Sequence, residues 1–205
     1  MAVHPVAVKN TFGSHLILWC LFLPLLSLIF IPLFFPDQPI SDTEVQMVAN
    51  MDIDVNSLTD SANSRFTSMF IDSGFKAKSE SFFNSGTQNA FQGFGARWIN
   101  GVWMMIYKAL WRAYVLARIF FIPLLVMAIA AAVDGSGVRA RKKYRFQTTN
   151  PVFFYSSTHL VVLMTGIFAF LPLAPISLSA TALVGLLVAL AAGIWLSAAN
   201  FQTGN

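Results

Sequence analysis

Charged residues are scarce in this chain, and cysteine is almost absent. Only 11% of the 205 residues are charged and 56% are hydrophobic, whereas an ordinary soluble domain has about 25% charged residues. So few charges cannot cover a water-soluble surface, and disorder is excluded because it requires low hydrophobicity and high charge. The single cysteine, Cys20, excludes a disulfide scaffold. The composition indicates an integral membrane protein with a small polar portion.

Motifs of common enzyme classes are also missing. The sequence has no HExxH, CxxC, P-loop or GxSxG pattern, and His4, His15 and His159 are far apart along it. Polar residues 156–158 precede His159 and could form a proton or ligand site with it. A helix start that is satisfied by lipid headgroups or neighbouring helices is the commoner arrangement. We therefore predict no enzymatic activity, no cofactor and no metal site.

The first apolar run, residues 16–35, carries no charge. Twenty helical residues cover about 30 Å, the thickness of the hydrocarbon core of a bilayer. The run is longer than the apolar part of a signal peptide and does not end in small residues, which favours an uncleaved anchor over a cleaved signal. Pro24 and Pro32 predict kinks in this helix.

Three further spans follow a polar stretch. Residues 119–133 are uncharged but short, so we expect the second span to include residues 113–116 as well. Pro123 predicts a kink in it. The third span lies within residues 152–174 and the fourth within residues 178–199, with a tight turn between them.

Residues 36–96 form the long polar stretch, with eight acidic and three basic residues. Ser41 or Asp42 can cap a first short helix, and Gly74 is expected to end a second one. Their apolar faces carry Val45, Val48 and Met51 in the first and Ala62, Phe66, Met69 and Phe70 in the second. The second face has few cations beside it, which favours packing on this region's own core or on another subunit over contact with lipid. Residues 84–96 predict a flexible linker.

Residues 97–118 predict an amphipathic helix at the membrane–water boundary, where Trp and Tyr are favoured. Its bases would cost at least about 2.5 kcal/mol each near mid-bilayer, which argues against a transmembrane placement. We expect this interfacial helix to continue into the second span, with Arg118 snorkelling or facing protein. The residues on or near its polar face are Arg97, Gly101, Lys108 and Arg112.

Residues 134–151 combine an expected helix break at Asp-Gly-Ser-Gly with a cluster of bases. Short loops rich in Lys and Arg stay in the cytoplasm, which places this loop and both termini inside the cell and residues 36–96 outside. We expect the bases to contact anionic lipid or an acidic partner, and Asp134 to pair with Arg139 or Arg141. The proposed docking residues are Asp134, Arg139, Arg141, Lys142, Lys143 and Arg145.

Small residues recur every four positions in the last span, at Gly185, Ala189 and Gly193. In lipid, such a stripe lets helix backbones approach closely, so we expect it to pack helices together and to favour an oligomer or a hetero-complex. Continuous apolar runs suit the bacterial inner membrane, because outer-membrane barrels use short alternating strands.

The sequence thus predicts an all-α integral membrane protein with four transmembrane helices, an interfacial amphipathic helix and a small helical periplasmic region. Its expected parts are a cytoplasmic tail with the first span (1–35), the periplasmic region (36–96), the interfacial helix continuing into the second span (97–133), the basic cytoplasmic loop (134–151), and the hairpin of the third and fourth spans with the C-terminal tail (152–205).

The region around the basic loop resembles a family of membrane proteins from integrative conjugative elements and related plasmids. Its matching features are the Val-Asp-Gly step at Val133, Asp134 and Gly135, the bases from Arg139 to Arg145, the segment with Phe154, Tyr155 and His159, and Arg112, Ala113 and Tyr114. The likeness covers about residues 110–200. It implies a role in conjugative DNA transfer, beside the type IV secretion channel and its coupling-protein ATPase, through a domain without an assigned activity.

We therefore expect a non-enzymatic inner-membrane subunit of a conjugation system. Its expected partners are membrane lipids and other membrane subunits of that machinery, including the coupling ATPase. Sequence-specific DNA binding is not expected, because no fold for reading bases is evident. The alternatives are an entry-exclusion or surface-recognition protein and a small transporter or channel.

Overall fold

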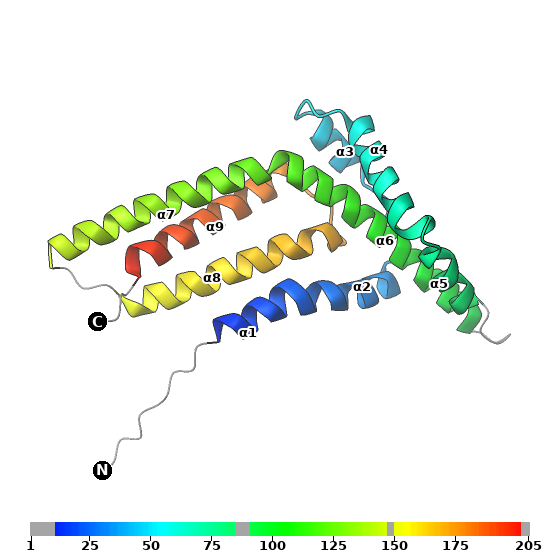
Figure 1. The fold of residues 1–205 in the computed structure, drawn as a ribbon, viewed down its shortest axis with the longest axis horizontal. Helices are drawn as coiled ribbons and strands as arrows, with labels where there is room; N and C mark the ends of the chain where they lie inside the picture. Colours follow the sequence, from blue (N-terminus) through cyan, green and yellow to red (C-terminus); the bar gives the residue numbers. More distant parts are fainter. Residues whose placement is uncertain (1–10, 85–90, 147–149, 202–205) are drawn as a thin grey trace, which may run out of the picture.

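The computed structural model describes residues 11–84, 91–146 and 150–201, and within these ranges the chain forms helices and no strand. Long helices run side by side, and shorter helices gather at one end of them (Figure 1). Four helical segments are long and apolar enough to cross a membrane. The prediction of an all-α membrane protein with four spans is confirmed.

Each span has a largely apolar outer surface. Phe30, Ile129 and Val184 are all more than half exposed, at 53%, 63% and 54%. Such side chains suit a lipid environment, in which apolar surface need not be hidden. The spans are α1 (Phe12–Ile17), the π-helical turn Leu18–Phe22 and α2 (Leu23–Phe34); α7 (Phe121–Tyr144); α8 (Pro151–Phe170) with the 3-10 turn Leu171–Leu173; and α9 (Ala180–Asn200).

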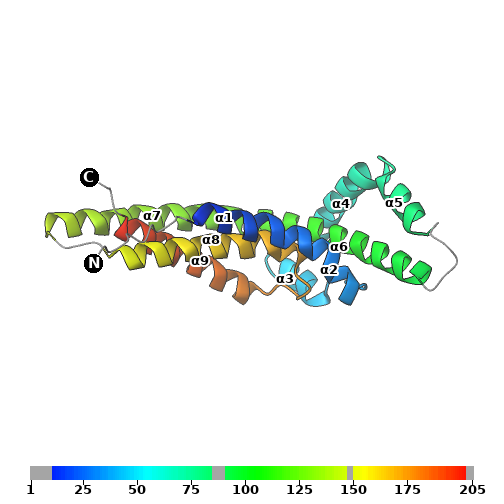
Figure 2. The ribbon, with the colours of Figure 1, turned by 90° about the horizontal axis from the view of Figure 1, so that it is seen from below.

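The two ends of the bundle hold different parts of the chain. The start of α1, the end of α7, the start of α8 and the end of α9 lie at one end (Figures 1 and 2). The turn between α8 and α9 lies at the opposite end, together with α6 (Phe91–Ile119). The described chain therefore begins and ends on the same side, as an even number of crossings requires.

A break at Phe120 separates α6 from α7, and the two helices meet at a bend (Figure 1). Pro123 explains the position of the break, because it has no N–H to donate to the carbonyl of Ile119 and its ring would clash with that carbonyl. The expectation that the second span includes residues 113–116 is therefore wrong, and α6 does not run unbroken into α7.

The second span reaches the length needed to cross a bilayer by extending at its C-terminal end, to Tyr144. The helix α7 passes through Asp134, Gly135, Ser136 and Gly137 without interruption, so the predicted helix break there is also wrong. Gly135 is buried against α9, where an added Cβ would lie 2.5 Å from the carbonyl oxygen of Trp195. This glycine serves close helix packing, which outweighs its low helix propensity.

Two other glycines bring spans together in the same way. A Cβ on Gly166 of α8 would lie 2.4 Å from the Cβ of Trp19, which belongs to the π-helical turn of the first span. A Cβ on Gly193 of α9 would lie 3.0 Å from Val161 of α8. The bundle is thus assembled by close approach of helices at positions without side chains.

The polar stretch folds onto α6 as three helices, α3 (Asp42–Ala49), α4 (Val55–Phe66) with the π-helical turn Thr67–Ile71, and α5 (Phe75–Asn84). Aromatic side chains of α6 hydrogen-bond to α4 and α5 through their polar groups. The indole of Trp111 donates to Thr59 at 3.2 Å, that of Trp103 donates to Ser79 at 3.1 Å, and the Tyr107 hydroxyl donates to Asn63 at 2.7 Å. These rings face protein.

Most of the predicted apolar faces of this region are buried as expected. Val48 and Ala62 are fully buried and Phe66 is 9% exposed, whereas Met69 is 45% exposed. The π-helical turn adds a residue to the helix at this point and rotates Met69 out of the stripe. Gly74 ends the segment with a φ of +71°, a conformation that glycine adopts without strain.

Of the predicted linker 84–96, residues 85–90 lie outside the described part of the chain. Asn84 is the last residue of α5, and the remainder from Phe91 onward is the first part of α6. This remainder is therefore helical, despite its two glycines.

We expect Gly135→Ala to lower the free energy of unfolding by about 1–3 kcal/mol, because the new methyl group overlaps the α9 backbone. Gly137 lies two residues away in the same helix with nothing within 4 Å of an added Cβ. Gly137→Ala should therefore be neutral or stabilising by up to about 1 kcal/mol through helix propensity. Thermal unfolding of the purified variants in detergent measures both, and equal effects would show that the α7–α9 contact is not tight.

Candidate functional site

A fully buried ion pair joins Glu44 of α3 to Arg112 of α6. Both residues have 0% exposure. The guanidinium faces the carboxylate with two of its nitrogens, at 2.5 Å from Nη2 to Oε1 and 3.3 Å from Nε to Oε2. This geometry is bidentate, and it is the one that the planar guanidinium group favours with a carboxylate.

The same two side chains capture the turn between α8 and α9. Arg112 donates to the carbonyl oxygens of Leu171, Ala174 and Ile176, and Glu44 accepts from the backbone N–H of Leu178 at 2.7 Å. These groups lie at the end of a helix and in a short connection, where backbone groups often lack helical partners. The Leu171 carbonyl also accepts from the N–H of Ala174 at 3.2 Å. The ion pair therefore joins the polar region, α6 and the hairpin turn at one point.

The placement of Arg112 differs from the sequence-based expectation. An interfacial helix would turn this residue and Lys108 toward water and headgroups, whereas the structure covers both with protein. The spacing of the sequence already indicated that Glu44 is buried, because Glu44 precedes Val48 by four residues and therefore lies on the apolar face of α3. An acidic residue on a buried face calls for a basic partner.

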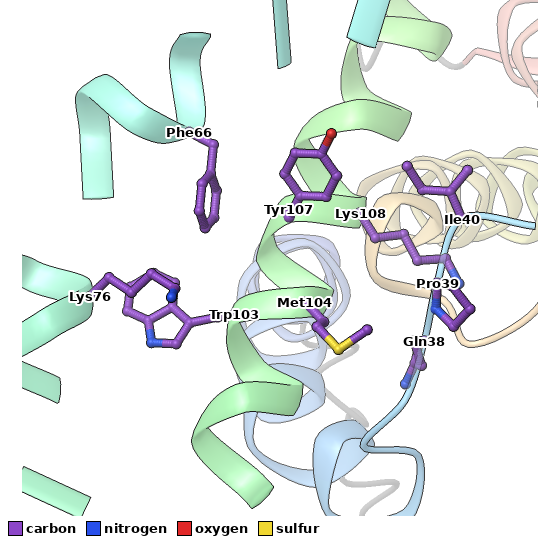
Figure 3. A pocket seen from close by; sticks show the side chains of 9 residues that line it. All are labelled: Gln38, Pro39, Ile40, Phe66, Lys76, Trp103, Met104, Tyr107 and Lys108. Atoms are coloured by element: carbon purple, nitrogen blue, oxygen red, sulfur yellow. The ribbon is translucent and has the colours of Figure 1, made fainter. Parts of the chain in front are cut away.

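A pocket of about 410 Å³ lies beside this ion pair, where the chain leaving the first span crosses α6. Figure 3 shows Lys108 reaching from α6 toward the segment of Gln38, Pro39 and Ile40. The pocket is bounded mainly by apolar and aromatic side chains. Its lining consists of Gln38, Pro39, Ile40, Phe66, Lys76, Trp103, Met104, Tyr107 and Lys108.

Lys108 is an unusual residue for such a wall, since it is only 5% exposed. Burial lowers the pKa of its amine below the ordinary value of 10.5, the Arg112 guanidinium lowers it further, and Glu44 partly opposes the change. No hydrogen bond or ion pair joins the amine to any residue in the described part of the chain. The sequence alone did not distinguish this lysine from an ordinary surface base.

The predicted docking residues lie at the opposite end of the bundle, on the last turns of α7. Asp134 accepts a hydrogen bond from the indole of Trp195 at 2.7 Å, and Arg141 lies 3.9 Å from it in an exposed ion pair. Arg139 stacks over the Phe201 ring, and the Lys142 amine donates to Asn200 at 3.0 Å. Two of the bases are thus held against the end of α9.

The other three bases, Arg141, Lys143 and Arg145, are exposed. Two aromatic residues beside them are also exposed, Tyr144 at 87% and Phe146 at 96%. The end of α7 extends beyond the neighbouring end of α9 (Figures 1 and 2). The result is a protruding helix end, formed by residues 141–146, with cations and aromatic rings on it.

Two histidines meet at the same end of the bundle. The Nδ1 atoms of His15 and His159 are 3.2 Å apart, although 144 residues separate them in the sequence. Phe12 packs on the His159 ring with a centroid separation of 4.5 Å. His4 lies outside the described residues. In the part of the chain that is described, no group of three or more His, Cys, Asp or Glu side chains is placed to hold a metal ion.

The small-residue stripe of α9 is divided between two environments. Gly193 packs on α8, as described above, and Ala189 is half-buried. Gly185 has nothing within 4 Å of an added Cβ among the described residues. Within the described part of the chain, the stripe therefore packs closely on another helix at Gly193 and leaves Gly185 open.

We expect Glu44→Gln to lower the free energy of unfolding by about 3–5 kcal/mol, because it leaves the Arg112 charge buried without its counter-ion. Arg112→Met should cost a similar amount for the opposite reason. The double variant should lose less than the sum of the two, since it buries no unpaired charge. Unfolding in detergent measures the coupling, with Asp60→Asn, an exposed acid of α4, as the control. Strictly additive losses would contradict the pairing.

The sequence was also compared with known proteins. Neither a curated protein nor a solved structure matches it significantly. A family model described as "IncC plasmid conjugative DNA transfer protein DtrJ-like" matches residues 36–202, which include Glu44, Arg112, the pocket and the basic end of α7. The match begins well before the region in which the sequence resemblance was evident. The chain belongs to this DtrJ-like family of conjugative DNA transfer proteins.

Proposed function

We propose that the protein is a non-enzymatic inner-membrane subunit of a conjugative transfer machinery, and that residues 141–146 dock an acidic surface of a partner. Membership of the DtrJ-like family places the chain in conjugative DNA transfer. The observation that carries the specific role is the protruding end of α7, with three exposed bases and two exposed aromatic rings. Arg and aromatic residues are enriched among the side chains that dominate protein interfaces.

The choice of partner follows from topology and charge. Bases near the ends of spans favour the cytoplasmic side, so the end of α7 would face the cytoplasm. A partner there needs an acidic surface beside the membrane. The coupling-protein ATPase of the secretion system is the partner that we propose first, and other channel subunits are the alternative. On this topology, α3, α4 and α5 would face the periplasm.

A transporter or channel is less well supported. Such a protein needs polar side chains that line a continuous path through the membrane. Ser27 and Thr165 instead donate to carbonyls of their own helices, Pro24 at 2.6 Å and Val161 at 2.8 Å. An entry-exclusion role would depend on the polar region and not on residues 141–146.

Charge reversal tests the docking role. Changing Arg141, Lys143 and Arg145 together to Glu should lower the transfer frequency by about tenfold or more, because like charges then meet at the interface. The variant should also fail to co-purify the coupling ATPase from donor membranes. The measurements are mating assays and a pull-down from membranes with matched expression.

The matched control reverses three exposed bases of the other end, Arg65, Lys78 and Arg97. It should leave both the transfer frequency and the co-purification unchanged. Loss of function in the control alone would instead favour recognition through the polar region. Normal transfer in both variants would remove the docking proposal.

Topology can be measured independently with single cysteines. In a Cys20→Ala background, Tyr144→Cys should react with a membrane-impermeant maleimide only after the cells are opened, because the α7 end faces the cytoplasm. Ser68→Cys in the polar region should react in intact spheroplasts. The reverse pattern would invert the topology and place residues 141–146 out of reach of a cytoplasmic ATPase.

A further inference from the structure

The pocket beside Lys108 has two polar groups without partners. Gln38 is 7% exposed, and its amide nitrogen donates to the carbonyl of Phe35 at 2.9 Å, whereas its Oε1 atom has no hydrogen-bond partner among the described residues. The Lys108 side chain is 5% exposed, and its amine has no hydrogen-bond or ion-pair partner among the described residues. A buried acceptor without a donor costs free energy, and a cation in a mostly apolar wall lacks the stabilisation of a counter-ion, so a group that supplies a donor and a negative charge would satisfy both.

The charge of that group follows from the surrounding ion pairs. Lys76 is paired with Glu80 at 2.8 Å, and Arg112 is paired with Glu44. Lys108 therefore leaves one positive charge uncompensated within the lining. A ligand with one negative charge would balance it, and a hydroxyl group would satisfy the acceptor of Gln38.

The remaining walls favour a ligand with an apolar part. Phe66, Trp103, Met104 and Tyr107 contribute rings and a thioether to the lining (Figure 3). The volume of about 410 Å³ falls within the usual range for small-ligand sites, about 300–1,000 Å³. An anionic head on an apolar body therefore fits better than a free inorganic ion.

The position of the pocket near the end of the first span makes a membrane lipid the ligand that can reach it. Gln38 follows the end of the first span at Phe34 by four residues, which reach at most about 14 Å when extended. The headgroup layer of a bilayer is about 5–8 Å thick on each side of the hydrocarbon core. The pocket is thus within reach of the headgroups that surround the span.

We propose that this pocket binds the monoanionic, hydroxyl-bearing headgroup of a membrane phospholipid. The phosphodiester accepts hydrogen bonds from the Lys108 amine, a headgroup hydroxyl donates to Gln38 Oε1, and the aromatic wall covers the glycerol and the start of the acyl chains. This lipid site is separate from the basic end of α7 and does not depend on the docking role. It links the segment leaving the first span to α6.

Native mass spectrometry of the full-length protein in detergent tests the site. Phosphatidylglycerol, which has one negative charge and headgroup hydroxyls, should be retained about tenfold more strongly than zwitterionic phosphatidylcholine. Lys108→Met should reduce this preference by about tenfold. It should also raise or preserve the melting temperature of the delipidated protein, because it removes an unpaired buried charge.

Two further variants keep the test decisive. Lys78→Met removes an exposed lysine of α5 and should leave lipid retention unchanged. Gln38→Glu places a negative charge in the pocket lining that Lys108 shares, and it removes the donor to the Phe35 carbonyl. This variant should lose the preference for phosphatidylglycerol, which keeps the proposal testable if Lys108→Met proves unstable.

Three results would overturn the proposal. One is equal retention of the two lipids by the unaltered protein. Another is an undiminished phosphatidylglycerol preference in both Lys108→Met and Gln38→Glu. The third is saturation of the pocket by soluble glycerol phosphate at the same concentration as the lipid, which would show that a free anion and not a membrane lipid is the ligand.

Discussion

The buried pair of Glu44 and Arg112 is the interaction on which the arrangement of this protein depends. A charged guanidinium at 0% exposure needs a counter-ion and a partner for each N–H group, and here it finds a carboxylate and three backbone carbonyls. Such a pair contributes little net stability, because removing both charges from water is costly. It is demanding in geometry, however, and it fixes α3, α6 and the α8–α9 turn relative to one another.

This constraint makes the polar region part of the membrane bundle. The helices α3–α5 are not a separate domain on a linker, because the buried Glu44 of α3 reaches the hairpin turn and aromatic residues of α6 hydrogen-bond to α4 and α5. Along the spans, contact depends instead on glycine. Lipid offers apolar side chains as good an environment as protein does, so helices associate where their backbones can approach, at Gly135, Gly166 and Gly193.

The two ends of the bundle differ in chemistry. One end carries exposed bases and aromatic rings on a helix that extends past its neighbours. The other carries an acidic helical region and a pocket with an uncompensated amine. The ion pair joins the polar region to the second of these ends.

The sequence by itself determined the number of spans, their approximate bounds, the apolar faces of α3 and α4, and the basic cluster, because hydropathy and helical periodicity are local properties. It misplaced the second span, because the Gly135 step was interpreted as a helix break, whereas this glycine packs against α9 and the break lies just before Pro123. It could not pair Glu44 with Arg112 or His15 with His159, and it could not bring Gln38 and Lys108 into the lining of one pocket. Which polar groups meet depends on how the helices cross, and only the tertiary structure sets that, because burial of a charge is tolerated wherever the fold supplies its partner.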